Sequence, residues 1–262
     1  MTLPTYQPGS DPGPNFIKLL ASLGYSAPPL DSALRVDAPH GTTIVAIRYA
    51  DGVLMAGDRR ATAGNMIAHR GIEKVFQADR YSGIAISGTV GPAMEMVKLF
   101  QTNLEHYEKV EDTALSLEGK ANQLEQMIRG NLPMAMQGLV VIPIFAGYDT
   151  RRETGRVFTY DVTGGRTEET DFHAAGSGGR DAHGAIKMVW KEGLTRDETV
   201  DLSIRALFEA ADEDSATGGP DTMRGIYPVV ATITKDGYQR IPDEEVAQRS
   251  HALIDSRTEG AR

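Results

Sequence analysis

Cysteine is absent from this 262-residue chain. Its absence excludes disulfide bonds, thiolate zinc sites, iron–sulfur clusters and cysteine nucleophiles. Long apolar runs are missing too: the longest, residues 139–146, contains a proline, whereas a bilayer-spanning helix needs roughly 20 apolar residues. A catalytic nucleophile in this chain must therefore be an oxygen or a nitrogen atom, and we expect no membrane partner.

An excess of positive charge is also absent. The chain has 27 basic and 36 acidic residues, a formal net charge of -9 and a pI near 5.2. Such a chain has no general field that attracts phosphate backbones or anionic lipids, so we expect no nucleic-acid partner. Because 40% of the residues are apolar, the chain is well able to form a hydrophobic core.

Metal and nucleotide motifs are likewise missing. The six histidines are scattered, and none forms a His-x-x-x-His pair. The glycine-rich segment 176–179 lacks the third glycine of a dinucleotide fingerprint, and Ser177 does not lie in a Gly-x-Ser-x-Gly elbow. We expect no metal and no cofactor, and interpret Ser177 as a turn residue whose hydroxyl caps or orients another group.

Proline is concentrated at the N-terminus, where residues 1–41 hold seven of the 13 prolines. This composition is typical of an arm or leader, and the segment shows no secretory signal. Within it, residues 16–23 have the apolar spacing of a short helix. We predict one domain over residues 42–262, preceded by a leader over residues 1–41.

From Thr42 onward, the periodicity predicts blocks of strands and helices in the order strands, two helices, strands, two helices, strands. The predicted strands are 42–49, 53–57, 74–77, 83–87, 139–148, 156–162, 166–174, 227–234 and 238–241. The predicted helices are 93–107, 117–132, 181–191, 197–211 and one that begins at Pro242. Hairpin connections and paired helices favour an α+β fold, a four-layer αββα sandwich of two antiparallel sheets flanked by helices.

The junction between Gly41 and Thr42 has two interpretations. Threonine is common in strands because it is β-branched, so Thr42 and Thr43 can simply begin a strand. Alternatively, cleavage after Gly41 would free the α-amine of Thr42, with a pKa near 7.7–8.0 when unperturbed, to act as the base for its own hydroxyl. Such a site also needs a cation and a carboxylate. Asp58 and Lys74 lie at strand ends, but their spacing alone does not decide between the interpretations.

The acidic cluster 212–214 also has two interpretations. At a predicted helix end, three carboxylates are most simply a solvated face. The small polar residues 215–219 that follow could instead close around a charged group.

Short motifs spread over residues 40–235 resemble those of proteasome β subunits, which are N-terminal nucleophile (Ntn) hydrolases. They are Thr42-Thr43-Ile44-Val45, Gly57-Asp58-Arg59-Arg60, Lys74, Ser87-Gly88-Thr89, Gly147-Tyr148-Asp149, Gly176-Ser177-Gly178 and Asp214-Ser215-Ala216-Thr217-Gly218-Gly219. Further segments resemble the actinobacterial type of this subunit, namely 39–43, 104–109, 129–132, 135–138 and 214–221. Two positions depart from the pattern: Thr217 stands where many relatives have serine, and residues 179–183 do not follow the relatives.

The resemblance implies a role for each site residue. Thr42 would be the nucleophile and its free amine the proton shuttle, with Gly41–Thr42 as the self-cleavage site. Lys74 would place positive charge beside the hydroxyl, and Asp58 would hold Lys74. The other implied residues are Gly88 as oxyanion donor, Ser177, Asp214 and Thr217 around the new N-terminus, and Ala61, Ile72, Phe76, Ile86, Val90 and Met94 in an apolar substrate pocket.

The resemblance further implies a cytoplasmic threonine endopeptidase in which heptameric β rings stack between rings of α subunits. An ATPase ring would deliver unfolded polypeptides tagged with a ubiquitin-like protein. Two alternatives remain: a two-ring relative without α subunits, which the leader and segment 104–109 disfavour, and a silent ring subunit. A silent subunit would not need Thr42, Asp58 and Lys74 together.

Overall fold

The computed structural model describes residues 41–260, and every one of them belongs to a single compact unit. The predicted helical spacing at 16–23 and the predicted leader, apart from Gly41, lie outside the described residues. No helix within 41–260 has both the length and the apolar character needed to cross a membrane.

The first sheet is antiparallel and has five strands in the order β10-β1-β2-β11-β12. Its strands are β1 (Thr43–Tyr49), β2 (Gly52–Gly57), β10 (Phe172–Gly176), β11 (Val229–Thr234) and β12 (Gly237–Arg240). The hairpin predicted at Asp51-Gly52 joins β1 to β2. Strand β1 therefore lies between β10 and β2, so its N-terminal end is flanked on both sides.

The second sheet is also antiparallel, in the order β5-β6-β7-β8-β9. It consists of β5 (Val75–Asp79), β6 (Ser82–Gly88), β7 (Val141–Asp149), β8 (Thr154–Tyr160) and β9 (Arg166–Glu169). A small separate hairpin joins β3 (Ala61–Ala63) to β4 (Met66–His69).

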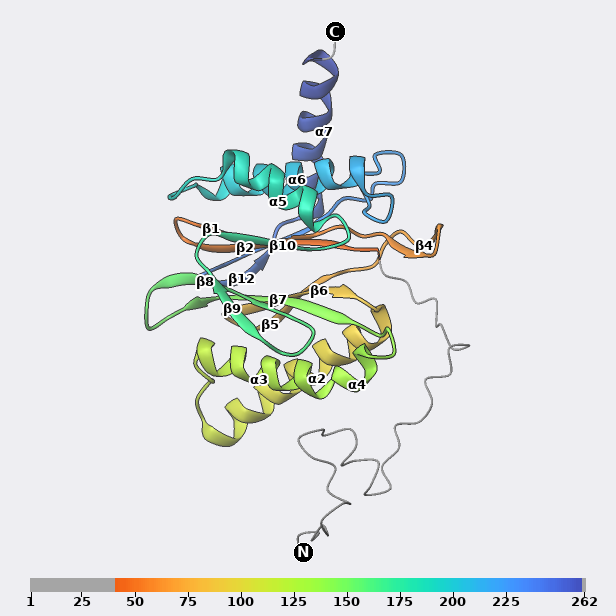
Figure 1. Ribbon diagram of the computed structural model, residues 1–262. Helices are drawn as coiled ribbons and strands as arrows, with labels where there is room; N and C mark the ends of the chain where they lie inside the picture. Colours follow the sequence, from red (N-terminus) through yellow and green to blue (C-terminus); the bar gives the residue numbers. More distant parts are fainter. Residues whose placement is uncertain (1–40, 261–262) are drawn as a thin grey trace, which may run out of the picture. The chain divides into compact units, whose positions relative to one another are not determined.

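Helices cover the outer face of each sheet (Figure 1). On the second sheet lie α2 (Val90–Glu111), α3 (Leu117–Gly130) and the short α4 (Leu132–Ala135); on the first lie α5 (Gly179–Val189) and α6 (Arg196–Glu213), and α7 (Asp243–Gly260) follows β12. The start of α6 is fixed by a capping box between Thr195 and Glu198.

Three apolar clusters fill the spaces between the layers. One joins β1 and β2 to α5 and α6, a second joins β6 and β7 to α2 and α3, and a third fills the space between the two sheets. This arrangement confirms the predicted αββα sandwich. Along β1, Ile44 and Ala46 face the opposite sheet, whereas Val45 and Ile47 face the helices.

One prediction about the strands was wrong, and one hairpin was not predicted. Segment 166–174 is not one strand: the chain bends at Thr170 and Asp171 and passes from β9 in the second sheet to β10 in the first. The bend is held where Arg48 N–H donates to Asp171 O. The β3–β4 hairpin was missed because it is short and β4 is exposed, so it lacks the alternation that marks a half-buried strand.

Candidate active site

Segments that are distant in the sequence lie together around Thr42, at the N-terminal end of β1. Ser177, just after β10, donates its backbone N–H to Thr42 O (2.8 Å), and Asp58, just after β2, donates its backbone N–H to Thr43 O (3.1 Å). The Thr42 side chain is buried, with the whole residue only 3% exposed. The two flanking strand ends therefore fix the backbone at Thr42 and Thr43.

The Thr42 hydroxyl lies against the peptide bond that precedes it. Its Oγ1 donates to Gly41 O at 2.6 Å. Gly41 is itself closely packed, since an added Cβ would lie 2.4 Å from the Ala216 Cβ and 2.5 Å from the Thr62 Oγ1. Only glycine fits there, so the Gly41–Thr42 junction is held beside the hydroxyl.

A buried ion pair lies next to this junction. Lys74 Nζ is 2.6 Å from Asp58 Oδ1, and the two side chains are 4% and 0% exposed. Nζ also donates to Arg60 O at 2.6 Å and to Gly41 O at 3.3 Å. The Lys74 ammonium group therefore contacts the same carbonyl oxygen as the Thr42 hydroxyl.

Backbone groups complete the hydrogen bonding of Asp58. Its Oδ1 accepts from Thr43 N–H (2.7 Å), and its Oδ2 accepts from Arg60 N–H (2.8 Å) and Gly218 N–H (2.9 Å). Burial lowers the pKa of Lys74 from its ordinary value, while the Asp58 carboxylate opposes that shift. The pair thus provides a cation that is held rigidly and largely out of solvent.

Asp214 holds the hydroxyl groups on the other side of Thr42. Its Oδ2 accepts from Ser177 Oγ (2.5 Å) and Thr217 Oγ1 (2.6 Å), and Ser177 Oγ in turn accepts from Thr42 N–H (3.2 Å). Burial acts to raise the pKa of Asp214, but hydrogen bonds from Ser177, Thr217 and Ala216 N–H outweigh it, and the net pKa is lowered. Asp214 is therefore a carboxylate that only accepts.

The acidic cluster at the end of α6 is accordingly divided. Asp212 and Glu213 are exposed, which agrees with the solvated-face interpretation for those two. Asp214 is half-buried and is turned toward Ser177 and Thr217.

Gly88 ends β6 in a conformation that excludes other residues. Its φ is +106°, and an added Cβ would lie 2.1 Å from Val140 O. Thr89 N–H donates to Val140 O on the β7 side, whereas Ile86 N–H donates to Lys74 O on the β5 side. Because donors alternate along a strand, the N–H of Gly88 points to the same side as Ile86, toward the Lys74 segment.

The six predicted pocket residues fall into two groups. Ile86 is buried in the cluster between the second sheet and its helices, and Phe76 and Met94 pack against that cluster. Ala61 is buried in β3, while Ile72 and Val90 are half-buried. The first three thus belong to one apolar cluster, and a shared pocket for all six remains a prediction.

The sequence analysis included several further contributors in its motifs but gave them no role in the site. Arg60, Ala216 and Gly218 act through backbone groups, which leave no mark in a sequence. Thr43 was also given no role, and the structure shows that its side chain is fully buried with its Oγ1 2.5 Å from Thr217 Oγ1. Its place beside Thr42 was visible, but strand alternation sends the two side chains to opposite faces.

Residues 41–260 contain no group of three or more histidine, aspartate or glutamate side chains placed to hold a metal ion. The arrangement around Thr42 instead supplies a hydroxyl, a buried cation, a carboxylate with two hydroxyl donors, and an oriented backbone N–H. These are the parts needed for nucleophilic attack on a carbonyl group.

Comparison with known proteins gives a consistent result. Residues 38–224 match the family model described as "Proteasome subunit". The chain is 57% identical over 267 aligned residues to the protein named "Proteasome subunit beta" of Acidimicrobium ferrooxidans, covering 100% of this chain and 97% of that relative. It is also 57% identical over 234 residues to the Streptomyces griseus protein of the same name, covering 89% of this chain and 83% of the relative.

Proposed function

Because this chain belongs to the proteasome subunit family and is a catalytic β subunit of the core particle, a threonine-type endopeptidase, we propose that Thr42 is its nucleophile. One observation carries this proposal: the Thr42 hydroxyl and the Lys74 ammonium group both contact Gly41 O, at 2.6 and 3.3 Å. A nucleophile and a cation that share one carbonyl oxygen are arranged for acyl transfer.

The first reaction is self-cleavage at Gly41–Thr42. Thr42 Oγ1 attacks the Gly41 carbonyl carbon, and Lys74 Nζ stabilises the negative charge that develops on Gly41 O. The hydroxyl proton passes to the Thr42 nitrogen as the C–N bond breaks, which leaves an ester between Gly41 and Thr42. Water then hydrolyses the ester, yielding a carboxylate on Gly41 and a free α-amine on Thr42. The leader over residues 1–41 is thereby removed.

The second reaction is hydrolysis of a substrate peptide bond. The free Thr42 amine takes the hydroxyl proton, Oγ1 attacks the carbonyl carbon, and the amine returns the proton to the leaving nitrogen. Water then resolves the acyl-enzyme. Gly88 N–H serves as oxyanion donor, a role worth about 2.7–4 kcal/mol of transition-state stabilisation. Asp214, Ser177 and Thr217 hold the amine, and Asp58 holds Lys74.

The apolar residues Ala61, Ile72, Phe76, Ile86, Val90 and Met94 form the substrate pocket in this proposal, which favours cleavage after hydrophobic residues. For assembly, we propose heptameric β rings stacked between α rings in the cytoplasm. An ATPase ring feeds this particle with substrates that carry a ubiquitin-like tag. The names of the two relatives support a proteasome core, and the partners beyond it rest on the family resemblance.

Intact-mass measurement of the subunit coexpressed with its α partner tests the proposal. We expect a mature chain that begins at Thr42 and cleaves a fluorogenic peptide with an apolar residue before the scissile bond. The Thr42→Ala chain should assemble, keep residues 1–41 and cleave no peptide. An assembled particle that retains Met1 and is fully active would overturn the self-cleavage step, and turnover by Thr42→Ala would place the nucleophile elsewhere.

A further inference from the structure

We propose that Thr43 is a positioning residue that couples the two halves of the active site and sets the protonation of the Thr42 amine through a chain of hydroxyl groups. The inference rests on the proposed function of Thr42. It concerns a residue whose hydroxyl touches neither the Thr42 hydroxyl nor Lys74, so any effect on catalysis must pass through other groups.

Thr43 contacts both halves of the site at once. Its backbone N–H donates to Asp58 Oδ1 at 2.7 Å, the same oxygen that receives Lys74 Nζ. Its Oγ1 lies 2.5 Å from Thr217 Oγ1, on the side of Asp214. The residue is 0% exposed, so solvent cannot replace either contact.

The direction of the hydrogen bond between the two threonines follows from Asp214. A carboxylate is acceptor-only, so the proton of Thr217 Oγ1 lies toward Asp214 Oδ2, 2.6 Å away. A hydroxyl group has one proton, and Thr217 Oγ1 therefore accepts in its contact with Thr43. Thr43 is the donor that begins a chain running through Thr217 to Asp214.

Asp214 connects this chain to the Thr42 nitrogen. The same Oδ2 accepts from Ser177 Oγ, and with its proton so engaged Ser177 Oγ accepts from Thr42 N–H. Hydrogen bonds in a chain polarise one another, so the Thr43 bond makes Thr217 a stronger donor to Asp214. Negative charge on Asp214 is then better neutralised, which keeps the Thr42 amine easier to deprotonate.

Other charged groups lie on the elements around this region and stay unchanged when Thr43 is altered. They come from the end of β2, the segment before β5, the end of α6 and the first turn of α5, and are Asp58, Arg60, Lys74, Asp212, Glu213, Arg180 and Asp181. A change of pH profile on removing only the Thr43 hydroxyl therefore reports the chain itself.

The test compares Thr43→Val with Thr43→Ser in particles coexpressed with the α partner. Valine keeps the γ-methyl group and loses the hydroxyl, whereas serine does the reverse. For Thr43→Val we expect kcat to fall about 3- to 10-fold with KM within about twofold, and the acid limb of kcat/KM to move about half a pH unit upward. Thr43→Ser should keep both the wild-type pH profile and most of kcat.

A packing role predicts the opposite ranking, with Thr43→Val close to wild type and Thr43→Ser impaired, and that result would refute the proposal. Should Thr43→Val not assemble, Thr43→Ala and Thr43→Ser form a second pair that differs only by the hydroxyl, and equal pH profiles in that pair would likewise refute it. Thr232→Val is the matched control, a buried strand threonine whose hydroxyl makes a long 3.5 Å contact with Gln239 O.

Thr42→Ala, measured in parallel, separates the two proposals. Peptidase activity that survives Thr42→Ala means that the proposed function fails. Activity that depends on Thr42 but has the same kcat and pH profile in Thr43→Val means that only the role of Thr43 fails.

Discussion

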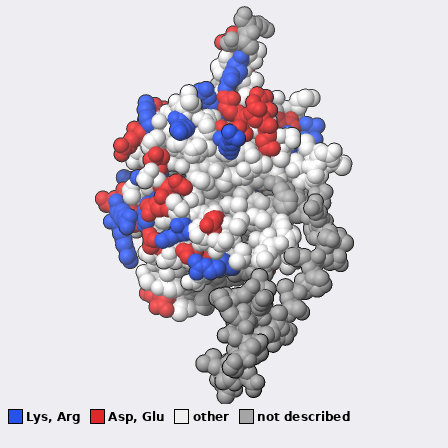
Figure 2. Space-filling model, in the orientation of Figure 1, with Lys and Arg blue, Asp and Glu red and all other residues white. Residues whose placement is uncertain are grey.

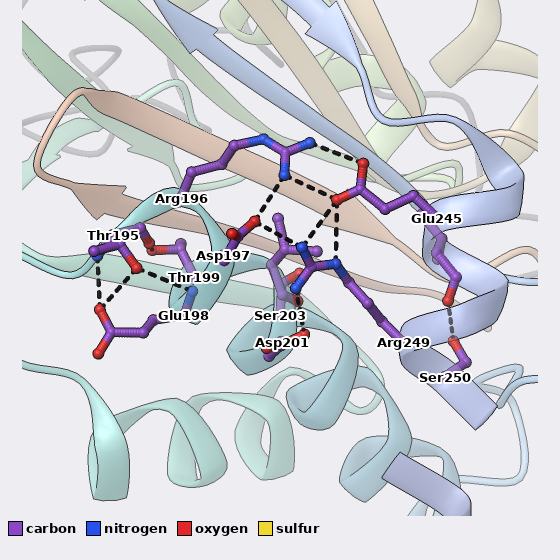
Figure 3. Close-up of polar contacts among 12 residues, drawn as sticks. Thr195, Arg196, Asp197, Glu198, Thr199, Asp201, Ser203, Glu245, Arg249 and Ser250 are labelled. Carbon is purple, nitrogen blue, oxygen red and sulfur yellow. Dashed lines mark hydrogen bonds and ion pairs between the residues drawn. The ribbon is translucent and has the colours of Figure 1, made fainter. Parts of the chain in front are cut away.

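The Asp58–Lys74 pair and a cluster between α6 and α7 both join acidic to basic side chains, but they differ in burial and in the number of partners. The buried pair has one cation and one carboxylate, 4% and 0% exposed. In the α6–α7 cluster, two arginines share three carboxylates (Figure 3): Arg196, Arg249, Asp197, Asp201 and Glu245. Figure 2 shows red and blue side chains mixed around the base of α7.

The two groups differ in how many carboxylate partners each cation has. Arg249 contacts Asp197 (2.6 Å), Asp201 (2.9 Å) and Glu245 (3.1 Å), so the loss of one partner leaves two. Water also reaches this cluster, since Asp197 and Asp201 are 67% and 61% exposed. Lys74 has a single carboxylate partner and almost no water, so a change there is not compensated. A buried charge with a single partner is expected at an active site, whereas an exposed cluster with shared partners mainly stabilises the contact between two helices.

Removing one cation from each cluster should give the largest contrast. We expect Lys74→Ala to abolish leader removal and to lower peptide turnover by about a hundredfold or more, because the buried cation that contacts Gly41 O beside the Thr42 hydroxyl is then lost. Arg249→Ala should process normally and keep turnover within about twofold, since it lies outside the site. Intact mass and fluorogenic turnover measure both, and near-normal rates for Lys74→Ala would refute its electrostatic role.

The buried pair can also be broken from its acidic side. Asp58→Asn should destabilise the subunit by about 3–5 kcal/mol, because Lys74 would remain buried without a charged partner. The double variant Asp58→Asn/Lys74→Met should regain much of that stability while staying inactive. Thermal unfolding of the isolated subunit measures both. If Asp58→Asn unfolds at the wild-type temperature, the burial of Lys74 does not depend on the Asp58 carboxylate.

Acid should affect Asp214 in a defined pH window. Its pKa is lowered in the folded subunit, so its stabilising contribution is present above the ordinary value near 3.9 and disappears as pH falls through the lower folded value. Asp214→Asn should therefore unfold at a lower temperature than wild type at pH 6, and the difference should shrink below pH about 4. A difference in unfolding temperature that stays constant from pH 6 to pH 3 would contradict a lowered pKa.

The smallest effect is expected in the α6–α7 cluster. Arg196 holds both oxygens of Glu245, at 2.8 and 3.0 Å, but its side chain is 40% exposed. Arg196→Gln should lower the unfolding temperature by no more than about 4 °C, and high salt should reduce even that. In the double variant Arg196→Gln/Arg249→Gln, the unfolding temperature should fall by more than the sum of the two single effects, because each arginine can still pair with the shared carboxylates when the other is removed. Simple additivity would mean that the partners are not shared.

Much of the fold followed from periodicity. Alternating and helical spacing located the strands of both sheets and, with the helix predicted from Pro242, five of the six helices in residues 41–260, since burial on one face imposes those periods. The sequence did not reveal that 166–174 divides between two sheets, because β9 and β10 are each short and the bend at Thr170 and Asp171 has no glycine or proline. Nor did it reveal the exposed β4, where neither face is buried.

The active site was predictable only in part. Residue types and the Gly41–Thr42 junction made a threonine nucleophile possible, but a lysine at a strand start usually faces solvent, and spacing could not show that Lys74 does not. The same holds for Asp214, which shares its sequence environment with Asp212 and Glu213. Only the path of the chain after α6 distinguishes the buried carboxylate from the two exposed ones.

By itself, the sequence determined that the nucleophile is not a thiol, that strand periodicity is present from Thr42 onward, and that antiparallel sheets alternate with paired helices. These properties depend on composition and local periodicity, which a linear sequence contains. The tertiary structure alone decided that Lys74 is buried against Asp58, that Gly88 N–H points toward the Lys74 segment, and that Thr43 joins Asp58 to Thr217. These pairs of residues lie from 14 to 174 positions apart in the sequence. They meet because strand pairing in the first sheet aligns the ends of β1, β2 and β10, and packing of the second sheet brings Lys74, just before β5, against them.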